Sequence, residues 1–497
     1  MEEPCVITAC QPADVVLATY NARFTHASLG LRWLLANLHP DPPSTTVLEF
    51  YMRVPVARAA ARILEYQPRV LALGVYIWNT QKMAELIRAV RSADPALVIV
   101  LGGPEVSADP EAFPEYAAVD AVIVGEAEEL FAVWARRLLA GIRPDHKIIQ
   151  GPPPDLAGLR LPYDYYSDAD LQSRHIYVET TRGCPFRCDF CVSGCEAGIR
   201  EFPLDTTLAA CCRLAERGVR TLRFVDRTFN ARPGRGAHIL DTLRPWADQG
   251  LRVHLEFTPQ SIYREDLQKA LCAWPAGALH IELGIQSFNE SVSQRVQRPG
   301  IRHTEAALRF LLDTAQAEVH ADLIVGLPGE DLDSIAAGFD RLLAHRPHEI
   351  QVGILKNLPG ANLDRHIQPW GLHFDTNPPY ALQSSSLLTN QELQRITQFA
   401  AYWDRLANHG LFPRTVPIIL QGHRSSFVAF MHLSDWLFAG FGRTHSIDLH
   451  DLCAALFGYL TVELRHDRET VRVAMAADFC ADGKRPKRSL PKCLRPV

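Results

Sequence analysis

The chain has 497 residues, of which 47% are hydrophobic and 22% charged, as in ordinary globular proteins. A formal net charge of −5 gives no electrostatic case for nucleic-acid binding by the whole chain. The first four residues are acidic rather than basic, and no apolar run approaches the ~20 residues that span a membrane. We therefore expect a cytoplasmic protein without a membrane anchor, in which the 12 cysteines form no disulfides.

Residues 1–150 alternate short apolar runs with longer amphipathic segments. This alternation is typical of a parallel sheet covered by helices on both faces. The pattern predicts an α/β, Rossmann-like doubly wound domain, which binds ligands beyond the carboxyl ends of its strands. Strands are predicted over residues 14–19, 46–50, 70–75, 97–101 and 121–124, and helices over 28–38, 56–66, 81–93 and 127–140.

Residues 151–360 form a second series, which begins after the linker-like Gly151-Pro152-Pro153-Pro154. Six strand–helix units are fewer than the eight of a closed barrel, so we predict a partial (β/α)6 barrel. Functional side chains should then lie at the carboxyl ends of its strands. The strands are predicted over 175–180, 221–226, 252–257, 280–285, 321–325 and 349–355, and the helices over 206–217, 235–249, 264–273, 303–315 and 332–345.

Residues 361–497 lose the strand pattern and are predicted to form a mostly helical third domain. Its tryptophans and phenylalanines are interpreted as core residues rather than as a cofactor box. A basic segment, Lys484 to Arg488, is interpreted as a solvated tail, with an anion or partner contact as the alternative. Helices are predicted over 390–408, 426–438, 448–460 and 469–479.

Three cysteines, Cys184, Cys188 and Cys191, follow the first predicted barrel strand with the spacing C-x3-C-x2-C. Thiolates hold iron in iron–sulfur clusters, and a cubane usually takes four of them. Three ligands would leave one iron open to a substrate, as catalytic metal sites require. Structural zinc is the alternative, although zinc favours paired C-x2-C halves or added histidines. Cys195 is either a fourth ligand or a nearby unligated thiol.

The same loop carries an aromatic residue, Phe190, directly before the last cysteine. C-x3-C-x-Φ-C at the end of the first strand of a partial barrel resembles the radical S-adenosylmethionine superfamily. The resemblance implies a [4Fe–4S] cluster, S-adenosylmethionine bound to the open iron, and a 5′-deoxyadenosyl radical that takes hydrogen from an unactivated carbon. It also implies cofactor contacts at the ends of the later strands, for which the candidates are Asp226, Glu256, Gln286 and Gly326.

Paired glycines, Gly102 and Gly103, end the fourth strand of the first domain and would let a bulky flat ligand approach the backbone. Glu126 follows the fifth strand in the pattern Val-Gly-Glu-Ala-Glu-Glu. A doubly wound domain of this kind before a radical barrel resembles the cobalamin-binding subclass of the superfamily. The loop after the first strand lacks the D-x-H-x-x-G pattern of a histidine that ligates cobalt, so its residues are expected to line the pocket instead. These residues are Tyr20, Asn21, Arg23 and His26.

The order of domains resembles a branch of the cobalamin-binding radical proteins with an additional C-terminal domain of unassigned function. The resemblance implies a C-methyltransferase that uses one S-adenosylmethionine to methylate cobalamin and a second to generate the radical. The alternatives are a cobalamin-dependent cyclisation or rearrangement without methyl transfer, and a non-catalytic cobalamin or Fe–S sensor. We expect a small-molecule or peptide substrate and an electron donor such as flavodoxin or ferredoxin, with no membrane or nucleic-acid partner.

Overall fold

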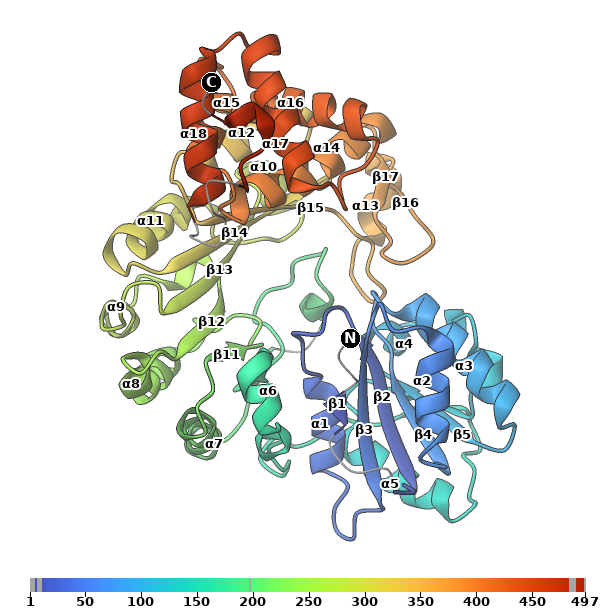
Figure 1. The fold of residues 1–497 in the computed structure, drawn as a ribbon. Coiled ribbons are helices and arrows are strands. Elements are labelled where there is room, and N and C mark those ends of the chain that lie inside the picture. The colour runs from blue at the N-terminus through green and yellow to red at the C-terminus, as the bar shows by residue number, and fades with distance from the viewer. Residues whose placement is uncertain (1–4, 7–10, 196–197, 482–488, 496–497) are drawn as a thin grey trace.

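The computed structural model describes residues 5–6, 11–195, 198–481 and 489–495. Figure 1 shows three parts: a flat sheet flanked by helices at the N-terminal side, a curved sheet with helices on its outside, and a helical C-terminal part. The α/β architecture predicted from the sequence is confirmed, with a doubly wound sheet followed by a partial barrel and a mostly helical region. The domain boundaries after residues 150 and 360 stay predictions.

The N-terminal sheet has seven strands in the order β1-β3-β2-β4-β5-β6-β7. Strand β1 is antiparallel to β3, and the other pairs are parallel. The chain reverses its direction of winding between β2 and β4, and ligands of doubly wound sheets bind at such a point. The strands are β1 (Cys5–Val6), β2 (Val15–Asn21), β3 (Thr45–Tyr51), β4 (Val70–Gly74), β5 (Val98–Gly102), β6 (Ala121–Val124) and β7 (Ile148–Gln150).

Helices cover both faces of this sheet, which explains why strands β4, β5 and β6 are apolar along their whole length. Helices α2 and α3 pack into one core, and α1 and α5 into the other. Ser28 caps the first helix, because its side chain accepts a hydrogen bond from the backbone of Leu31. The helices are α1 (Leu29–Ala36), α2 (Val56–Leu64), α3 (Thr80–Ala93), α4 (Pro104–Ser107) and α5 (Glu128–Leu139).

The central sheet has six parallel strands in sequential order, β8-β11-β12-β13-β14-β15, and therefore forms an open barrel. Along β13 buried and partly exposed residues alternate strictly, because one face packs on helices and the other lines the lumen. The strands are β8 (Ile176–Val178), β11 (Thr221–Phe224), β12 (Arg252–Phe257), β13 (Leu279–Gln286), β14 (Glu318–Val325) and β15 (Glu349–Ile354).

The outer helices of the barrel match the predicted segments to within a few residues. The predicted helix over 303–315 is divided, since its last part, Phe310–Thr314, has π-helical hydrogen bonding. The short helices α6 and α10 were not predicted. The helices are α6 (Asp168–Ser173), α7 (Leu204–Glu216), α8 (Arg235–Ala247), α9 (Glu265–Cys272), α10 (Glu290–Arg295), α11 (Thr304–Arg309) and α12 (Leu332–Leu343).

The two ends of the cysteine loop pair with each other as a two-stranded antiparallel ribbon of β9 (Thr181–Arg182) and β10 (Arg200–Glu201). Strand β9 begins three residues after β8 ends, so the loop starts at the carboxyl end of the first barrel strand. The ribbon brings both ends of the loop together beside the N-terminal domain, where Arg182 and Arg200 both contact Glu126.

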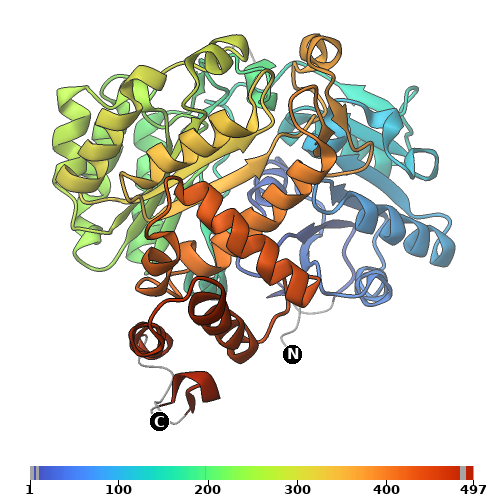
Figure 2. The ribbon, with the colours of Figure 1, turned by 90° about the horizontal axis from the view of Figure 1, so that it is seen from above.

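The C-terminal helices pack on the end of the barrel, as Figure 2 shows from above. An aromatic cluster joins the two parts: Phe339 of α12 lies 5.1 Å from Phe399 and 4.9 Å from Trp403 between ring centroids. These aromatic residues are buried, which confirms that they belong to the core. The helices are α13 (Asp364–Trp370), α14 (Asn390–Trp403), α15 (Thr415–Leu420), α16 (Ser426–Phe441), α17 (Leu449–Gly458) and α18 (Arg468–Cys480).

A small hairpin of β16 (His373–Phe374) and β17 (Leu382–Ser384) interrupts the helical region and was not predicted. The basic segment from Lys484 to Arg488 lies outside the described residues. Among the described helices, none has the length and apolar character that crossing a membrane would require.

Candidate active site

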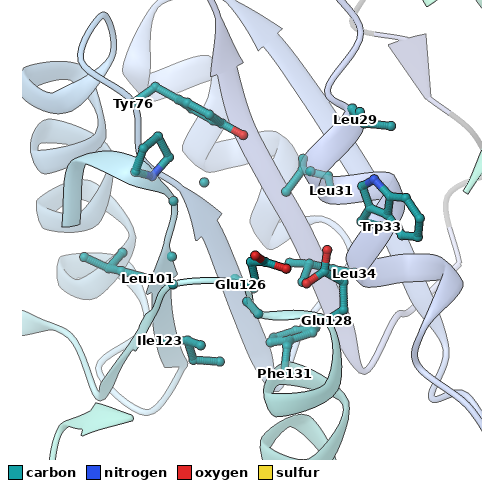
Figure 3. Close-up of a pocket in the computed structure, with 18 of the residues that line it drawn as sticks. Leu29, Leu31, Trp33, Leu34, Tyr76, Leu101, Ile123, Glu126, Glu128 and Phe131 are labelled. Atoms are coloured by element: carbon teal, nitrogen blue, oxygen red, sulfur yellow. The ribbon is translucent and has the colours of Figure 1, made fainter. Parts of the chain in front are cut away.

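An apolar cavity of about 400 Å³ lies at the carboxyl ends of β4, β5 and β6, on the side covered by α1 and α5. Figure 3 shows Trp33, Leu34 and Phe131 around it, with the carboxylates of Glu126 and Glu128 between them. This volume and lining are typical of a pocket for the apolar part of a large ligand. Glycines form much of the rim: Gly30, Gly74, Gly102, Gly103 and Gly125.

Gly103 has a structural reason to be glycine. Its φ is +109°, and a Cβ there would lie 2.5 Å from the carbonyl oxygen of Val75. Any side chain would therefore push strand β5 away from β4 at the point where the cavity opens. The paired glycines predicted to allow close approach of a ligand thus also hold two strand ends together.

A second cavity, of about 640 Å³, lies between the N-terminal domain and the barrel. Asn21 and His26 line it from one side, and Tyr177 and Glu256 from the other. It continues the apolar cavity, because both are lined by Leu29, Gly30, Tyr76, Pro104, Glu126, Glu179, Arg182 and Arg227. The strand ends of the two domains therefore face one continuous space.

A third cavity, of about 140 Å³, lies at the mouth of the barrel. Cys184, Cys188 and Cys191 all line it, together with Phe190, and all three cysteines are free thiols. Arg227 lines this cavity and the other two, and so connects them. The structure thus brings the predicted cluster ligands to the same space as the predicted cobalamin pocket.

The barrel cavity contains polar atoms that have no hydrogen-bond partner. The oxygens Thr258 Oγ1 and Gln286 Oε1 are buried and unpaired, and so is Arg298 Nε. All three residues line this cavity. Buried polar groups are nearly always paired in native proteins, so these atoms indicate a polar ligand at this position.

The three thiols differ in their surroundings. Cys188 is buried, its sulfur accepts a 3.8 Å contact from Arg298 Nη1, and burial raises its pKa despite the nearby guanidinium. The Cys184 sulfur lies 3.5 Å from Thr228 Oγ1. Within the described residues, no three His, Cys, Asp or Glu side chains are placed to hold one metal ion together. In a cubane, by contrast, each thiolate binds a different iron.

The carboxylates of the barrel lumen are held in a partly desolvated state. Burial raises the pKa of Glu256 to about 7, although Arg227 opposes the shift. Burial likewise raises the pKa of Asp322 to about 6, against the effect of His320. On the opposite side of the space, burial lowers the pKa of His26, and Arg223 lowers it further. A cationic ligand beside Glu256 would restore the charged form of this carboxylate.

Arg182, two residues before Cys184, joins the cysteine loop to the N-terminal domain. Its guanidinium donates to Glu126 and Glu128, each at 2.6 Å, and to Glu179 at 2.9 Å. The arginine side chain is only 12% exposed. Three carboxylates from two domains thus converge on one buried cation at the junction of the two larger cavities.

Most of the residues predicted to contact the cofactors line one of the three cavities. Phe190, Glu256 and Gln286 line the barrel cavity, and the N-terminal candidates that line the first two cavities are Asn21, His26, Gly102, Gly103 and Glu126. His26 also hydrogen-bonds the hydroxyl of Tyr177. The side chain of Cys195 lies outside the described residues, so its role stays open.

Four predicted contacts do not line these cavities. Asp226 is buried beneath the barrel mouth and accepts hydrogen bonds from Thr180 and Thr181, while its neighbour Arg227 enters the space. The other three are Tyr20, Arg23 and Gly326. Tyr20 packs on Phe50 in the core because alternate residues of a strand point to opposite faces, and Arg23 is exposed. Gly326 is covered by Leu382, whose Cδ2 would lie 2.4 Å from a Cβ at residue 326.

The sequence reasoning missed several residues of the site. Arg182 directly precedes the Gly-Cys that opens the loop, and Glu128 lies in the same Glu-Ala-Glu-Glu run as Glu126. Both residues are therefore adjacent to a motif that is evident in the sequence. Arg227, Arg298 and Asp322 had no comparable signal, because their place in the site depends on the curvature of the barrel.

Comparison with protein families finds three matches along the chain. Residues 15–135 match the B12 binding domain, residues 178–342 match the radical SAM superfamily, and residues 368–496 match a protein of unknown function, DUF4080. The first two matches cover the cavities described above, and the third covers the helical region.

Individual relatives align with about two thirds of this chain. The cobalamin-dependent radical SAM methyltransferase TokK of Streptomyces tokunonensis is 27% identical over 366 residues, 65% of this chain and 52% of TokK. The 2-(S-pantetheinyl)-carbapenam-3-carboxylate methyltransferase of Streptantibioticus cattleyicolor is 27% identical over 346 residues, 61% of this chain and 50% of that enzyme. The alignments thus span about half the length of these curated relatives.

A solved structure has the same fold. The radical S-adenosylmethionine methyltransferase TsrM from Kitasatospora setae, determined with cobalamin and a [4Fe–4S] cluster bound, superimposes with a TM-score of 0.61. The match covers 76% of this chain and 82% of TsrM, at 18% sequence identity. At that identity the likeness concerns the fold.

The matched domains identify the cofactors: B12 for the first, and S-adenosylmethionine with its [4Fe–4S] cluster for the second. The cavities fit these groups, since the first is apolar with a glycine rim and the third combines three thiols with unpaired polar atoms. The chain thus combines a B12-binding domain, a radical S-adenosylmethionine domain and a DUF4080 domain, in that order.

Proposed function

We propose that this protein is a cobalamin-dependent radical S-adenosylmethionine enzyme that methylates an unactivated carbon. The observation that carries the proposal is the continuous space in which the three-cysteine loop and the glycine-edged cavity face each other. Methyl transfer between two cofactors requires that both reach one substrate, and Arg227 lines every part of this space. The relatives named as methyltransferases support the same reaction class.

We assign Cys184, Cys188 and Cys191 as the ligands of the cluster. When bound, the reduced cluster supplies an electron to S-adenosylmethionine, and cobalamin supplies a transferable methyl group. Gln286 and Thr258 offer unpaired acceptors to the amine and ribose hydroxyls of S-adenosylmethionine. Glu256, which lines both the barrel cavity and the interdomain cavity, is placed to contact S-adenosylmethionine and the substrate.

The remaining side chains orient the cofactors and exclude water. The apolar wall formed by Trp33, Leu34 and Phe131 keeps solvent from the buried part of cobalamin. His26 is held against Tyr177 of the barrel and, with its lowered pKa, stays neutral at physiological pH. The neutral His26 therefore lines the space as a hydrogen-bonding residue and adds no second positive charge to that of Arg227.

Two further aspects belong to this proposal. The enzyme would receive electrons from a flavodoxin or ferredoxin, since the radical chemistry consumes reducing equivalents. It would work in the cytoplasm, where a reducing environment keeps the cysteines as thiols or cluster ligands. The substrate would be a small molecule or a peptide.

The test is an anaerobic incubation of the reconstituted protein with cobalamin, a chemical reductant and methyl-labelled S-adenosylmethionine. Small-molecule and peptide extracts serve as the substrate source. We expect 5′-deoxyadenosine, S-adenosylhomocysteine and a product that carries the labelled methyl group. Formation of 5′-deoxyadenosine with an unlabelled, isomeric or cyclised product would replace methylation by rearrangement. A protein that carries the cluster and never cleaves S-adenosylmethionine would be a sensor.

A further inference from the structure

Asp189 lies inside the cysteine loop, between Cys188 and Cys191, and its side chain is completely buried. Its backbone N–H donates to the carbonyl of Val296 at 3.1 Å, just after helix α10. Its Oδ1 accepts a hydrogen bond of 2.8 Å from Gln297 Nε2. The barrel therefore satisfies one of the two carboxylate oxygens.

The second oxygen is satisfied by helix α13, at the start of the predicted C-terminal domain. Asp189 Oδ2 accepts from Arg365 Nε at 3.1 Å and pairs with His366 Nε2 at 2.8 Å. The backbone carbonyl of Asp189 also accepts a 2.9 Å bond from the N–H of Asn362. Residues about 175 positions apart in sequence thus meet inside the loop that carries the thiols.

Helix α13 also contacts a second loop of the barrel. The Trp370 ring lies 4.5 Å beneath the Arg295 guanidinium, and Arg295 Nη1 donates to the Pro328 carbonyl at 2.6 Å. Gly329 is packed so closely that a Cβ there would lie 2.8 Å from the Trp370 ring. One short helix therefore touches the cysteine loop at one end and the turn after the fifth barrel strand at the other.

A buried carboxylate is strongly unfavourable unless it is paired with charge and hydrogen bonds. The loop conformation that buries Asp189 therefore depends on Arg365 and His366. The thiols immediately before and two residues after Asp189 are carried by the same backbone, so their spacing depends on this contact as well. Groups that orient metal ligands from outside contribute substantially to metal affinity.

We propose that helix α13 is part of the iron–sulfur site, and that Asp189, Arg365 and His366 form a clamp that positions the cysteine loop for the cluster. The clamp assigns a role to the start of the C-terminal region: it completes the radical site rather than only covering it. All three are positioning residues, since they act through the loop. The inference rests on the proposed function in taking the three cysteines as cluster ligands.

The test compares cluster binding in Arg365→Ala, His366→Ala and Asp189→Asn with that of the full-length wild-type chain. Each protein is reconstituted anaerobically, and iron and sulfide per chain are measured before and after challenge with an iron chelator. Electron paramagnetic resonance of the reduced cluster is recorded with and without S-adenosylmethionine. We expect cluster retention to fall about tenfold or more and the signal to change, as for other outer ligands of metal sites.

Arg395→Ala is the matched control. Arg395 also belongs to the C-terminal region and pairs with a carboxylate, Asp435, at 2.7 Å. Its side chain is 37% exposed and that of Arg365 is 47% exposed, so neither substitution empties the core. We expect the control to keep the cluster and its spectrum. Unfolding midpoints of the apoproteins separate a loss of the clamp from a general loss of stability.

The double variant Asp189→Asn with Arg365→Ala gives a second, independent measure. If the residues act as one clamp, the double variant loses no more cluster than the more affected single variant. Clamp variants that retain the cluster and its response to S-adenosylmethionine as the wild type does would overturn the inference. A wild-type chain that binds no cluster would instead refute the proposed function, so the two failures are distinguishable.

Discussion

The continuous space between the two domains is lined in opposite ways on its two sides, the cobalamin side and the barrel side. On the cobalamin side, strands β4 and β5 are apolar on both faces and end in glycines, so the cavity is lined mainly by backbone and apolar side chains, with Glu126, Glu128 and Arg182 as its charged residues. On the barrel side, strands β12, β13 and β14 turn mostly apolar residues outward and several titratable residues inward. The inward titratable residues include His254, Glu256, His280, Glu282, His320 and Asp322.

The difference follows from the form of each sheet. A flat sheet covered by helices has no room for polar groups except at its strand ends. An open barrel encloses a lumen, so one side chain in two faces a partly hydrated interior. We infer that the cobalamin face selects its ligand by shape, and the barrel face by hydrogen bonds and charge. Substitutions on each face test this division.

The largest effect is expected at the thiols. Cys188→Ser keeps the volume of the buried side chain but removes a soft ligand, so cluster binding and reductive cleavage of S-adenosylmethionine should fall on the order of 1,000-fold. The measurements are iron content and 5′-deoxyadenosine formation. Cys211→Ser, at a buried thiol on helix α7 away from the site, is the control and should retain both. An active Cys188→Ser protein would contradict the ligand assignment.

Arg182 tests the junction between the faces. Arg182→Ala leaves Glu128 and Glu179 without their cation and Glu126 with Arg200 alone, so the free energy of unfolding should fall by about 3 kcal/mol. Urea unfolding with separate probes in the two domains should then show two transitions instead of one. A single, unshifted transition would show that the two domains are coupled elsewhere, for example through the buried pair of Arg32 and Asp170.

A substitution at Gly103 tests the cobalamin side, where backbone atoms line the pocket. Gly103→Ala introduces strain from a positive φ and a collision with Val75, together about 1–3 kcal/mol, and should weaken cobalamin binding about tenfold. The affinity is measured by absorbance titration. Gly141→Ala has a similar φ of +80° with no atom within 4 Å, so it should cost stability alone. Equal cobalamin affinities for the two variants would show that the strand ends do not shape the pocket.

The last test concerns Glu256, on the barrel side. Its pKa is raised from 4.5 to about 7 by burial, so the folded state binds more protons than the unfolded state between these values. The free energy of unfolding should therefore fall by about 3 kcal/mol as the pH rises through this window. Glu256→Gln should remove this part of the pH dependence in urea unfolding of the apoprotein. An unchanged profile would mean that the carboxylate is already charged at low pH.

The periodicity of the sequence predicted the elements well because each depends on local pattern. The strands from β2 to β6 and the six barrel strands lie within a few residues of the predicted ranges. The short strands β1, β7, β9, β10, β16 and β17 were missed, since two or three residues leave little periodic signal. The cysteine spacing and the glycine pair are evident in the sequence itself.

The chemistry of the site was therefore readable from the sequence alone: three thiols on one loop, a glycine pair after a strand, and two alternating domains in series. Only the tertiary structure decided which side chains meet there. Asp226 and Arg227 are adjacent in sequence, yet Asp226 accepts hydrogen bonds from Thr180 and Thr181, whereas Arg227 lines the shared space. Asp189 finds its partners on α13 because the chain returns to the cysteine loop after the last barrel strand. Contacts between distant segments depend on sheet curvature and domain packing, which local sequence patterns do not encode.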